Sequence, residues 1–576
     1  MAEKAIILPD GISVADVNEK LTAENKLGSK YRKRREEDMN ENYTLYRNKV
    51  KINRLTQRQP MNIPLMKETI KTLVSKTNAP IHINFKNRDG DLDKEIYVNA
   101  LWNDTAEKDL LNIKARVDKK SCYLYGRTHF ALEIDPNFSN IVRFNPRDAF
   151  DLNIDPETSP WDIDTARYYS ENNIFKTLNE VTTNNRFDKD ARILLSEDYQ
   201  GSVGKNSDAY QKKMERILAM GYYQNQGQWG QQKADSMVAL QYNHTYLWDK
   251  TKKEYIRYYV VRGDEKHILR AKPYSTVFGV DFWLLEGWAE DLEASDYWSD
   301  SIADIVRIPN KALNTWISQY LENRTLHAFG MNAYDSTKDF TPKQFSPKPW
   351  AWIPMPGKPK DIYQRMDIPE LKGTLEDIQF LVNIAERASA TGSLEKGAVE
   401  DVKRTLGEVE IAVSNALERT NDIAPLYNSA YQRLAKKWYN LMVANMVGKR
   451  EVTLYKENPD GQIKGKTISA KDIQSENGYE VQSTDKAQKD LENIDQITKL
   501  RAGRELFPNN AAMRKAERKR FMRIIDLTPQ EADEIEQEEL QNAEQELLQI
   551  AQPQPLLPQA PVSNPQPLPK TPTSVV

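Results

Sequence analysis

The sequence contains a single cysteine, Cys122, among 576 residues. No disulfide can form within one chain, and a zinc site would need ligands of other kinds. The five histidines are scattered, without the HExxH or His-x3-His spacing that places two zinc ligands on one helical face. We therefore predict no metal site and no cofactor. Cys122 lies in an apolar stretch, and we expect it to be a small buried side chain.

Long apolar runs and an excess of one charge are also lacking. No run approaches the roughly 20 apolar residues of a bilayer-spanning helix, and the apolar stretch near the N-terminus is too short for a signal peptide, so we expect a soluble protein made in a cytoplasm. The 81 Lys and Arg residues balance 84 Asp and Glu residues, which excludes a basic nucleic-acid clamp over the whole chain. The mean hydropathy of −0.73 is typical of an extended or ring-forming subunit with a large polar surface.

Signatures of catalysis are missing as well. The hydrolase pattern GxSxG is absent. Segment 461–467, GQIKGKT, has three residues between its glycines, one fewer than the phosphate-loop motif requires, so we expect a hairpin turn there. Segment 88–95 resembles a calcium loop, but Lys94 stands where that loop needs glycine, which favours a solvated acidic turn. We predict that the chain is not an enzyme.

A cluster of aspartates is the remaining candidate for catalysis. Paired carboxylates could hold metal ions for a nuclease. Because the segment is punctuated by Asn-Pro, Asp-Pro and Ser-Pro, we expect these residues to stabilise turns instead. They are Asp148, Asp151, Asp155, Asp162 and Asp164.

Hydrophobic periodicity predicts an α+β chain that is predominantly helical. In the first half, alternating apolar residues mark strands and spacings of three and four mark helices. The predicted elements there are two surface helices (27–59 and 63–76), a helical stretch (94–120), two short strands around Gly126, strands with tight turns (141–170) and a β-hairpin (241–263).

The second half alternates long helices with segments that cannot be helical. Residues 328–368 hold six prolines, so we expect extended strand and loop there. Pro309 interrupts or restarts the helix before this segment, and Pro425 kinks a long helix after it. The predicted elements are helices at 296–327 and 369–391, the long helix from about 399 to 446, a β-hairpin at 450–473, helices at 486–550 and a Pro-rich tail at 551–576.

This order of parts resembles the portal, or head-to-tail connector, proteins of tailed bacteriophages. Segment 125–156, YGRTHFALEIDPNFSNIVRFNPRDAFDLNIDP, is similar to the wing of portal proteins. Segment 391–414, TGSLEKGAVEDVKRTLGEVEIAVS, is similar to the loop and helix start that follow their second stem helix. The resemblance covers about residues 30–550 and rests on the order of these patterns.

The resemblance implies an elongated subunit whose regions follow one another along the chain. Its implied regions are the wing (1–295), the first stem helix (296–327), the clip (328–368), the second stem helix (369–391), the tunnel loop (392–404), a long kinked helix and hairpin of the wing (405–485), the crown (486–550) and a disordered tail (551–576).

The resemblance also implies a function and partners. Portal subunits form a ring, normally of twelve copies, around a channel for double-stranded DNA at one capsid vertex. We therefore expect a virion protein, assembled in the host cytoplasm, that contacts the major capsid protein and no membrane. Its clip would dock the large terminase subunit during packaging and head-tail adaptors afterwards.

The implied tunnel loop mixes charges of both signs. Lys396, Lys403 and Arg404 alternate with acidic residues, as suits a conduit that must not hold DNA tightly. In this interpretation the three cations face the channel, and Lys396 touches DNA phosphates transiently and without sequence preference. The alternative is that they form ordinary surface ion pairs on a helix.

The implied clip carries two tryptophans among prolines. Trp350 and Trp352 have little local core to fill, and tryptophan is enriched at interface hot spots. We expect both, with Lys358 and Lys360, to contact the clip's partners. Packing of the tryptophans within the segment itself is the alternative.

Two other functions stay open. A nuclease or ATPase of the packaging machinery would need the phosphate loop or carboxylate set that is missing above. A capsid scaffold protein would be mostly coiled coil, which the β-rich stretches at 121–170 and 235–262 disfavour. The basic segment 501–523 could face packaged DNA or pair with the acidic segment 531–546.

Overall fold

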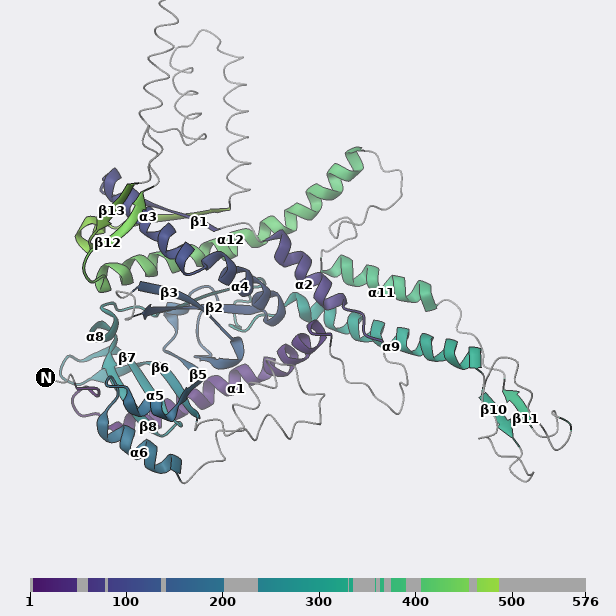
Figure 1. The fold of residues 1–576 in the computed structure, drawn as a ribbon, viewed down its shortest axis with the longest axis horizontal. Coiled ribbons are helices and arrows are strands. Elements are labelled where there is room, and N and C mark those ends of the chain that lie inside the picture. Colours follow the sequence, from purple (N-terminus) through teal and green to yellow (C-terminus); the bar gives the residue numbers. More distant parts are fainter. Residues whose placement is uncertain are drawn as a thin grey trace, which may run out of the picture. The chain divides into compact units, whose positions relative to one another are not determined.

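The chain divides into two units, Met1–Gln488 and Lys489–Val576. The structure, a computed structural model, describes parts of the first unit only: residues 4–48, 61–77, 81–135, 141–200, 237–329, 331–334, 358, 363–366, 374–389, 406–454 and 464–485. These residues form a mixed α+β fold, as the sequence predicted (Figure 1). The predicted tunnel loop, crown and tail lie outside the described residues.

The N-terminal helices differ from the prediction of two surface helices. Helix α1 (Val14–Tyr46) begins at Ser13, whose side chain and that of Asp16 cap each other's backbone N–H groups. Helix α2 (Leu65–Lys76) buries one whole face, so the prediction of a surface helix is wrong here. Its buried apolar residues, none more than 6% exposed, are Leu65, Met66, Ile70, Leu73 and Val74.

The prediction of two strands around Gly126 is wrong for the first strand. Helix α3 (Leu92–Lys108) is followed by α4 (Leu111–Tyr125), and only then does strand β2 (Arg127–Asp135) begin. Gly126 ends α4 with a φ of 83°, and its N–H donates to the carbonyl of Cys122 at 2.7 Å. A Cβ at this position would lie 2.0 Å from the carbonyl oxygen of Ser299, so the site requires glycine.

Strands of the first unit pair antiparallel in every sheet that the structure describes. The three-stranded sheet has the order β3-β2-β9, with β3 at Ile141–Arg147 and β9 at Leu285–Ala289. The five-stranded sheet has the order β4-β5-β6-β7-β8, whose strands are Leu152–Ile154, Tyr168–Thr177, Met237–Asp249, Glu254–Gly263 and His267–Pro273. The predicted hairpin is confirmed, because β6 and β7 pair from Asp249 and Glu254 onward.

Shorter elements complete this part of the chain. Strand β1 (Ile81–Asn87) pairs with β14 (Tyr479–Asp485), and β12 (Arg450–Leu454) pairs with β13 (Lys464–Ile468). The β12–β13 pair confirms the hairpin predicted at 450–473. Residues Lys464 to Thr467 of the segment GQIKGKT lie within β13 itself, so the turn predicted there is wrong for these four residues. The short helices are η2 (Ala149–Asp151), η3 (Ile163–Thr165), α5 (Leu178–Thr183), α6 (Lys189–Gln200), α8 (Tyr274–Phe278) and α13 (Ala470–Ile473).

Helix α12 (Leu406–Asn445) supplies the centre of the main hydrophobic core and continues through Pro425. Trp438 meets Trp102 of α3 edge to face, with ring centroids 5.0 Å apart. A buried carboxylate, Asp118 of α4, accepts hydrogen bonds from Thr128, from Trp288 and from Tyr431 of α12. The helix is therefore tied to the strands by both packing and hydrogen bonds.

Three of the five predicted aspartates, Asp148, Asp155 and Asp162, stabilise turns, as predicted. Asp151 and Asp164 instead bind Asn173 and Lys437. Asp148 and Asp162 accept hydrogen bonds from backbone N–H groups at the starts of η2 and η3. Asp155 binds the Arg167 guanidinium through two contacts of 2.7 and 2.9 Å. In the other acidic segment, Asp91 caps α3 through the N–H groups of its first turn. Cys122 is fully buried, as predicted.

Candidate functional site

Two helices stand out because no other described element covers part of their surfaces. Helix α9 (Ile302–Phe329) packs against α11 (Thr374–Ala388), and strands β10 (Met331–Tyr334) and β11 (Tyr363–Met366) pair antiparallel beyond α9 (Figure 1). The helix predicted at 296–327 therefore starts later and runs through Pro309 without a break. The helix predicted at 369–391 is observed as α11.

The start of α9 is fixed by its own sequence. Ser301 donates its hydroxyl to the carboxylate of Asp304 at 2.8 Å, and the N–H of Asp304 returns a bond to that hydroxyl at 3.2 Å. This reciprocal capping satisfies N–H groups that have no partner within the helix. Residues 296–301 consequently stay outside the helix, which corrects its predicted start.

The inner faces of the pair are buried. Val306 and Leu313 of α9 and Ala385 of α11 belong to one apolar cluster with α2 and the end of α4. Ile378 and Val382 of α11 pack against the same cluster. The spacing of these residues follows the helical repeat, as the sequence analysis predicted for α11.

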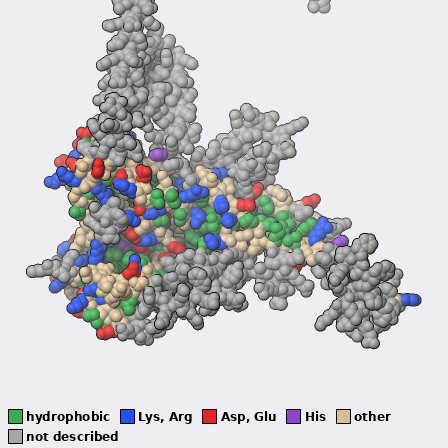
Figure 2. All heavy atoms as spheres, viewed as in Figure 1, with side chains coloured by type: hydrophobic (Ala, Val, Ile, Leu, Met, Phe, Trp, Pro, Cys, Tyr) green, Lys and Arg blue, Asp and Glu red, His purple; other side chains and the backbone are tan. Residues whose placement is uncertain are grey.

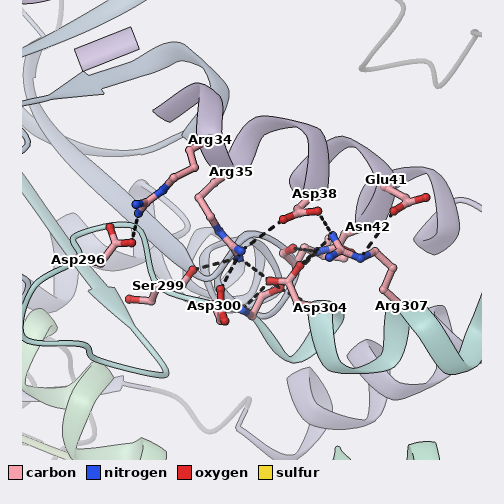
Figure 3. Close-up of polar contacts among 12 residues, drawn as sticks. Arg34, Arg35, Asp38, Glu41, Asn42, Asp296, Ser299, Asp300, Asp304 and Arg307 are labelled. Carbon is pink, nitrogen blue, oxygen red and sulfur yellow. Dashed lines mark hydrogen bonds and ion pairs between the residues drawn. The ribbon is translucent and has the colours of Figure 1, made fainter. Parts of the chain in front are cut away.

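A network of charged residues joins α1 to the start of α9 (Figure 3). Arg35 of α1 contacts the carboxylates of Asp304 at 2.6 Å and Asp300 at 2.7 Å. Arg307 of α9 reaches back to Asp38 of α1 at 2.5 Å. The side chains of Arg35 and Asp304 are only 13% and 11% exposed, so this pair is shielded from solvent and holds the helices more firmly than a surface pair would.

Asp304 is the centre of this network. Burial alone would raise the pKa of its carboxyl group, but hydrogen bonds from Asn42 and Ser301 and the charge of Arg35 outweigh burial and lower that pKa. The carboxylate is therefore ionised at neutral pH and holds the base of α9 against α1. The basic run of α1 is thus used within the chain.

The opposite face of α9 carries apolar side chains that no described element covers. Ile305, Ile308 and Trp316 are 50%, 72% and 36% exposed. Their spacing of three and eight residues keeps them on one side of the helix, and the residues between them on that side, Pro309 and Ala312, carry no charge. Figure 2 shows hydrophobic side chains gathered over this part of the molecule.

Helix α11 has a matching outer face. Phe380 is 63% exposed and Ile384 is 40% exposed, one helical turn apart. We call these five residues, Ile305, Ile308, Trp316, Phe380 and Ile384, the outer apolar faces. The sequence analysis missed them, although large apolar residues on both sides of α11 were a visible signal of contact on two sides.

Of the residues that the sequence predicted to be functional, the structure describes only Lys358. Lys358 is exposed to solvent. Outside the described residues lie Trp350, Trp352, Lys360, Lys396, Lys403 and Arg404.

The described residues also contain no group of three or more His, Cys, Asp or Glu side chains arranged to hold a metal ion. Over the same residues, no helix has the length and apolar character needed to cross a bilayer. No protein-family model and no curated protein sequence matches the chain.

Proposed function

We propose that this chain is a portal subunit of a tailed bacteriophage. Copies of it, normally twelve, form a ring at one capsid vertex, assembled in the host cytoplasm and carried in the virion. Double-stranded DNA is packaged and later ejected through the ring's channel. The subunit performs no chemical reaction of its own.

One observation carries this proposal: no element that the structure describes covers the outer apolar faces of the helix pair. In a chain with 29% charged residues, five large apolar side chains on one helix pair require a partner. Burying such side chains contributes about 1.5–3 kcal/mol each. The five side chains are between 36% and 72% exposed, so burying their exposed parts would stabilise a subunit contact by roughly 4–8 kcal/mol before the costs of association.

A second copy of the chain is the partner that covers both faces. If α9 of one copy packs against α11 of the next, the contact is heterologous, and repetition around an axis closes a ring. The inner attachments support this arrangement, because the charged network and the apolar cluster fix the pair to the body. The helix pair is thus held at a fixed orientation to the body and can form one segment of the channel wall.

The order of elements supports the same proposal. An α+β body comes first, then α9, the β10–β11 pair, α11 and the long helix α12. In the portal assignment the body is the wing, α9 and α11 are the stem, and the β10–β11 pair belongs to the clip. The major capsid protein contacts the ring from outside.

Two further assignments belong to this proposal. The loop 392–404 lines the channel, where Lys396, Lys403 and Arg404 meet DNA phosphates transiently and without sequence preference. The clip docks the large terminase subunit and then head-tail adaptors through Trp350 and Trp352 and the neighbouring lysines.

Oligomeric mass tests the proposal directly. Light scattering coupled to size exclusion on the purified full-length chain should give a closed assembly, roughly 800 kDa for twelve subunits of 66.5 kDa. Monomers over the whole range of protein and salt concentrations would contradict it.

A further inference from the structure

The outer side of α4 carries an apolar stripe that no described element covers. Ile113 and Val117 of this helix are 60% and 43% exposed, and Leu110, directly before it, is 57% exposed. Spacings of three and four residues place these three side chains, the apolar stripe, along one side of the helix. The other side of α4, with Ala115 and Cys122, is buried in the main core. The ring proposal gives the apolar stripe no role.

Leu110 has a backbone conformation that does not suit leucine. Its φ of 55° and ψ of 41° lie in the left-handed region, which glycine and asparagine adopt more readily than residues with bulky side chains. The residue also precedes the first turn of α4, to which a leucine side chain offers no hydrogen-bond acceptor. Because this side chain is mostly exposed, packing within the chain does not compensate for the local cost. A leucine at this position therefore points to a contact outside the chain.

A row of cations runs beside the apolar stripe. Arg116 and Lys120 lie one turn apart on α4, and the helical repeat places them next to Ile113 and Val117. We call these two cations, together with Arg47 beyond the end of α1, the basic row. Among the residues that the structure describes, no carboxylate forms an ion pair with any of the three. The basic row is therefore not neutralised within the described part of the chain.

Lys120 shows this lack of neutralisation most clearly. Burial lowers the pKa of its ammonium group, and the charge of Arg47 lowers that pKa further. Its Nζ atom lies 6.0 Å from the centre of the Tyr46 ring, a contact that leaves the charge in place. Two cations close together, one of them partly desolvated, favour an anionic group beside them.

The other two cations of α4 are already used within the chain. Lys114 contacts the carboxylate of Asp109 at 2.7 Å. Lys119 is buried and donates to a backbone carbonyl group. The one carboxylate of α4, that of Asp118, is fully buried and binds groups of the core. The outer side of α4 is thus apolar along one stripe and basic along the next.

We propose that the outer side of α4 docks an amphipathic helix of another protein, whose apolar side chains cover the apolar stripe and whose acidic side chains meet the basic row. Both rows follow the axis of α4, so one helix laid along it can meet both. Apolar contact supplies affinity, and the charges select an acidic partner. Antiparallel pairing of this side with itself would bring the cations of two copies together, so a second copy does not fit. The inference does not depend on ring formation.

Two synthetic peptides of about 20 residues, long enough to form helices, test the proposal by fluorescence anisotropy. Both present the same stripe of leucines, which is flanked by glutamates in one peptide and by lysines in the other. The glutamate-flanked peptide should bind the full-length chain at least tenfold more tightly. A nonspecific effect of charge would give the reverse order, because the chain has a net charge of −3. Equal binding of the two peptides, or no binding of the glutamate-flanked one at millimolar concentration, would overturn the proposal.

Substitutions locate the binding surface. Arg116→Glu combined with Lys120→Glu should reverse the preference, so that the lysine-flanked peptide binds more tightly. Ile113→Ser should weaken binding of the glutamate-flanked peptide at least tenfold, whereas Leu194→Ser, at a 53% exposed position on α6, is the matched control and should leave it unchanged. Thermal unfolding establishes that each variant is folded. An unchanged preference in the folded charge-reversal variant would overturn the assignment.

Leu110→Asn separates docking from a role in the fold. Asparagine tolerates the left-handed conformation and can accept a hydrogen bond at the start of α4, so the melting temperature should not fall. Peptide binding should nevertheless weaken several-fold. A lower melting temperature with unchanged peptide binding would overturn the place of Leu110 in the docking surface. Vesicles of anionic phospholipid are the competing binder, and vesicle binding that Ile113→Ser abolishes, without any peptide binding, would assign the surface to a membrane and overturn the proposal.

Discussion

Replacing Ile308 by glutamate should abolish ring assembly while leaving the subunit folded. Ile308 is 72% exposed, so its removal costs the fold at most about 0.5 kcal/mol. In an assembled ring the same substitution loses about 1.5–3 kcal/mol of apolar burial and adds the cost of desolvating a charge.

The combined penalty is at least roughly 3 kcal/mol per contact, which lowers the association constant more than about 100-fold. Sedimentation velocity should therefore show monomers for the variant under conditions where the unmodified chain forms rings. Ile193→Asp, at a 47% exposed position on α6, is the matched control and should assemble normally. Intact rings of the Ile308 variant, with unchanged thermal unfolding, would refute the assignment of the outer apolar faces to the subunit contact.

Five further variants test the core, the charged network and the clip. Asp118→Ala should lower the free energy of unfolding by about 3–5 kcal/mol in urea titrations, because three buried donors lose their acceptor; a loss under 1 kcal/mol would contradict this. Burial raises the pKa of the Asp118 carboxyl group to about 6, so ionisation of this group disfavours the folded state. The free energy of unfolding should therefore fall as pH rises from about 4 to 6. Asp118→Asn should remove this dependence on pH. Gly126→Ala should cost several kcal/mol or prevent folding, and normal yield with an unchanged melting temperature would show that the backbone contact is misplaced. Arg35→Ala should speed amide hydrogen exchange at the start of α9. Unchanged exchange rates would contradict the claim that the charged network holds this helix end against α1. Replacing Trp350 and Trp352 together by alanine should leave rings intact and weaken terminase or adaptor docking in pull-down assays, and unaltered docking would contradict the clip assignment.

Much of the fold follows from local sequence signals, and the main error shows where such signals fail. The β6–β7 and β12–β13 hairpins were predictable because alternation and turn residues are local. The helical end of α4 was not predictable, because the adjacent residues Tyr123 and Leu124 within it are both fully buried. A helix that is covered on more than one side has apolar residues on several faces, so its sequence no longer shows a hydrophobic period of 3.6 residues. The aromatic residues at the end of α4 therefore predicted a strand.

The candidate site was predictable only in part. Periodicity identified the inner face of α11, where Ile378 and Val382 pack, because that face repeats regularly. It could not identify Phe380 and Ile384 as uncovered, since exposure depends on which other elements pack nearby. The charged network was equally hidden, because Arg35 and Asp304 are far apart in the sequence and a local pattern assigns basic helical residues to the surface.

The most direct test of the central claim is an electron-microscopic reconstruction of the purified full-length chain. The account predicts a closed ring in which α9 and α11 of every copy surround one shared axis and leave a hole wide enough for a DNA duplex. A particle in which the helix pairs lie away from that axis, or a chain that forms no closed assembly, would contradict it.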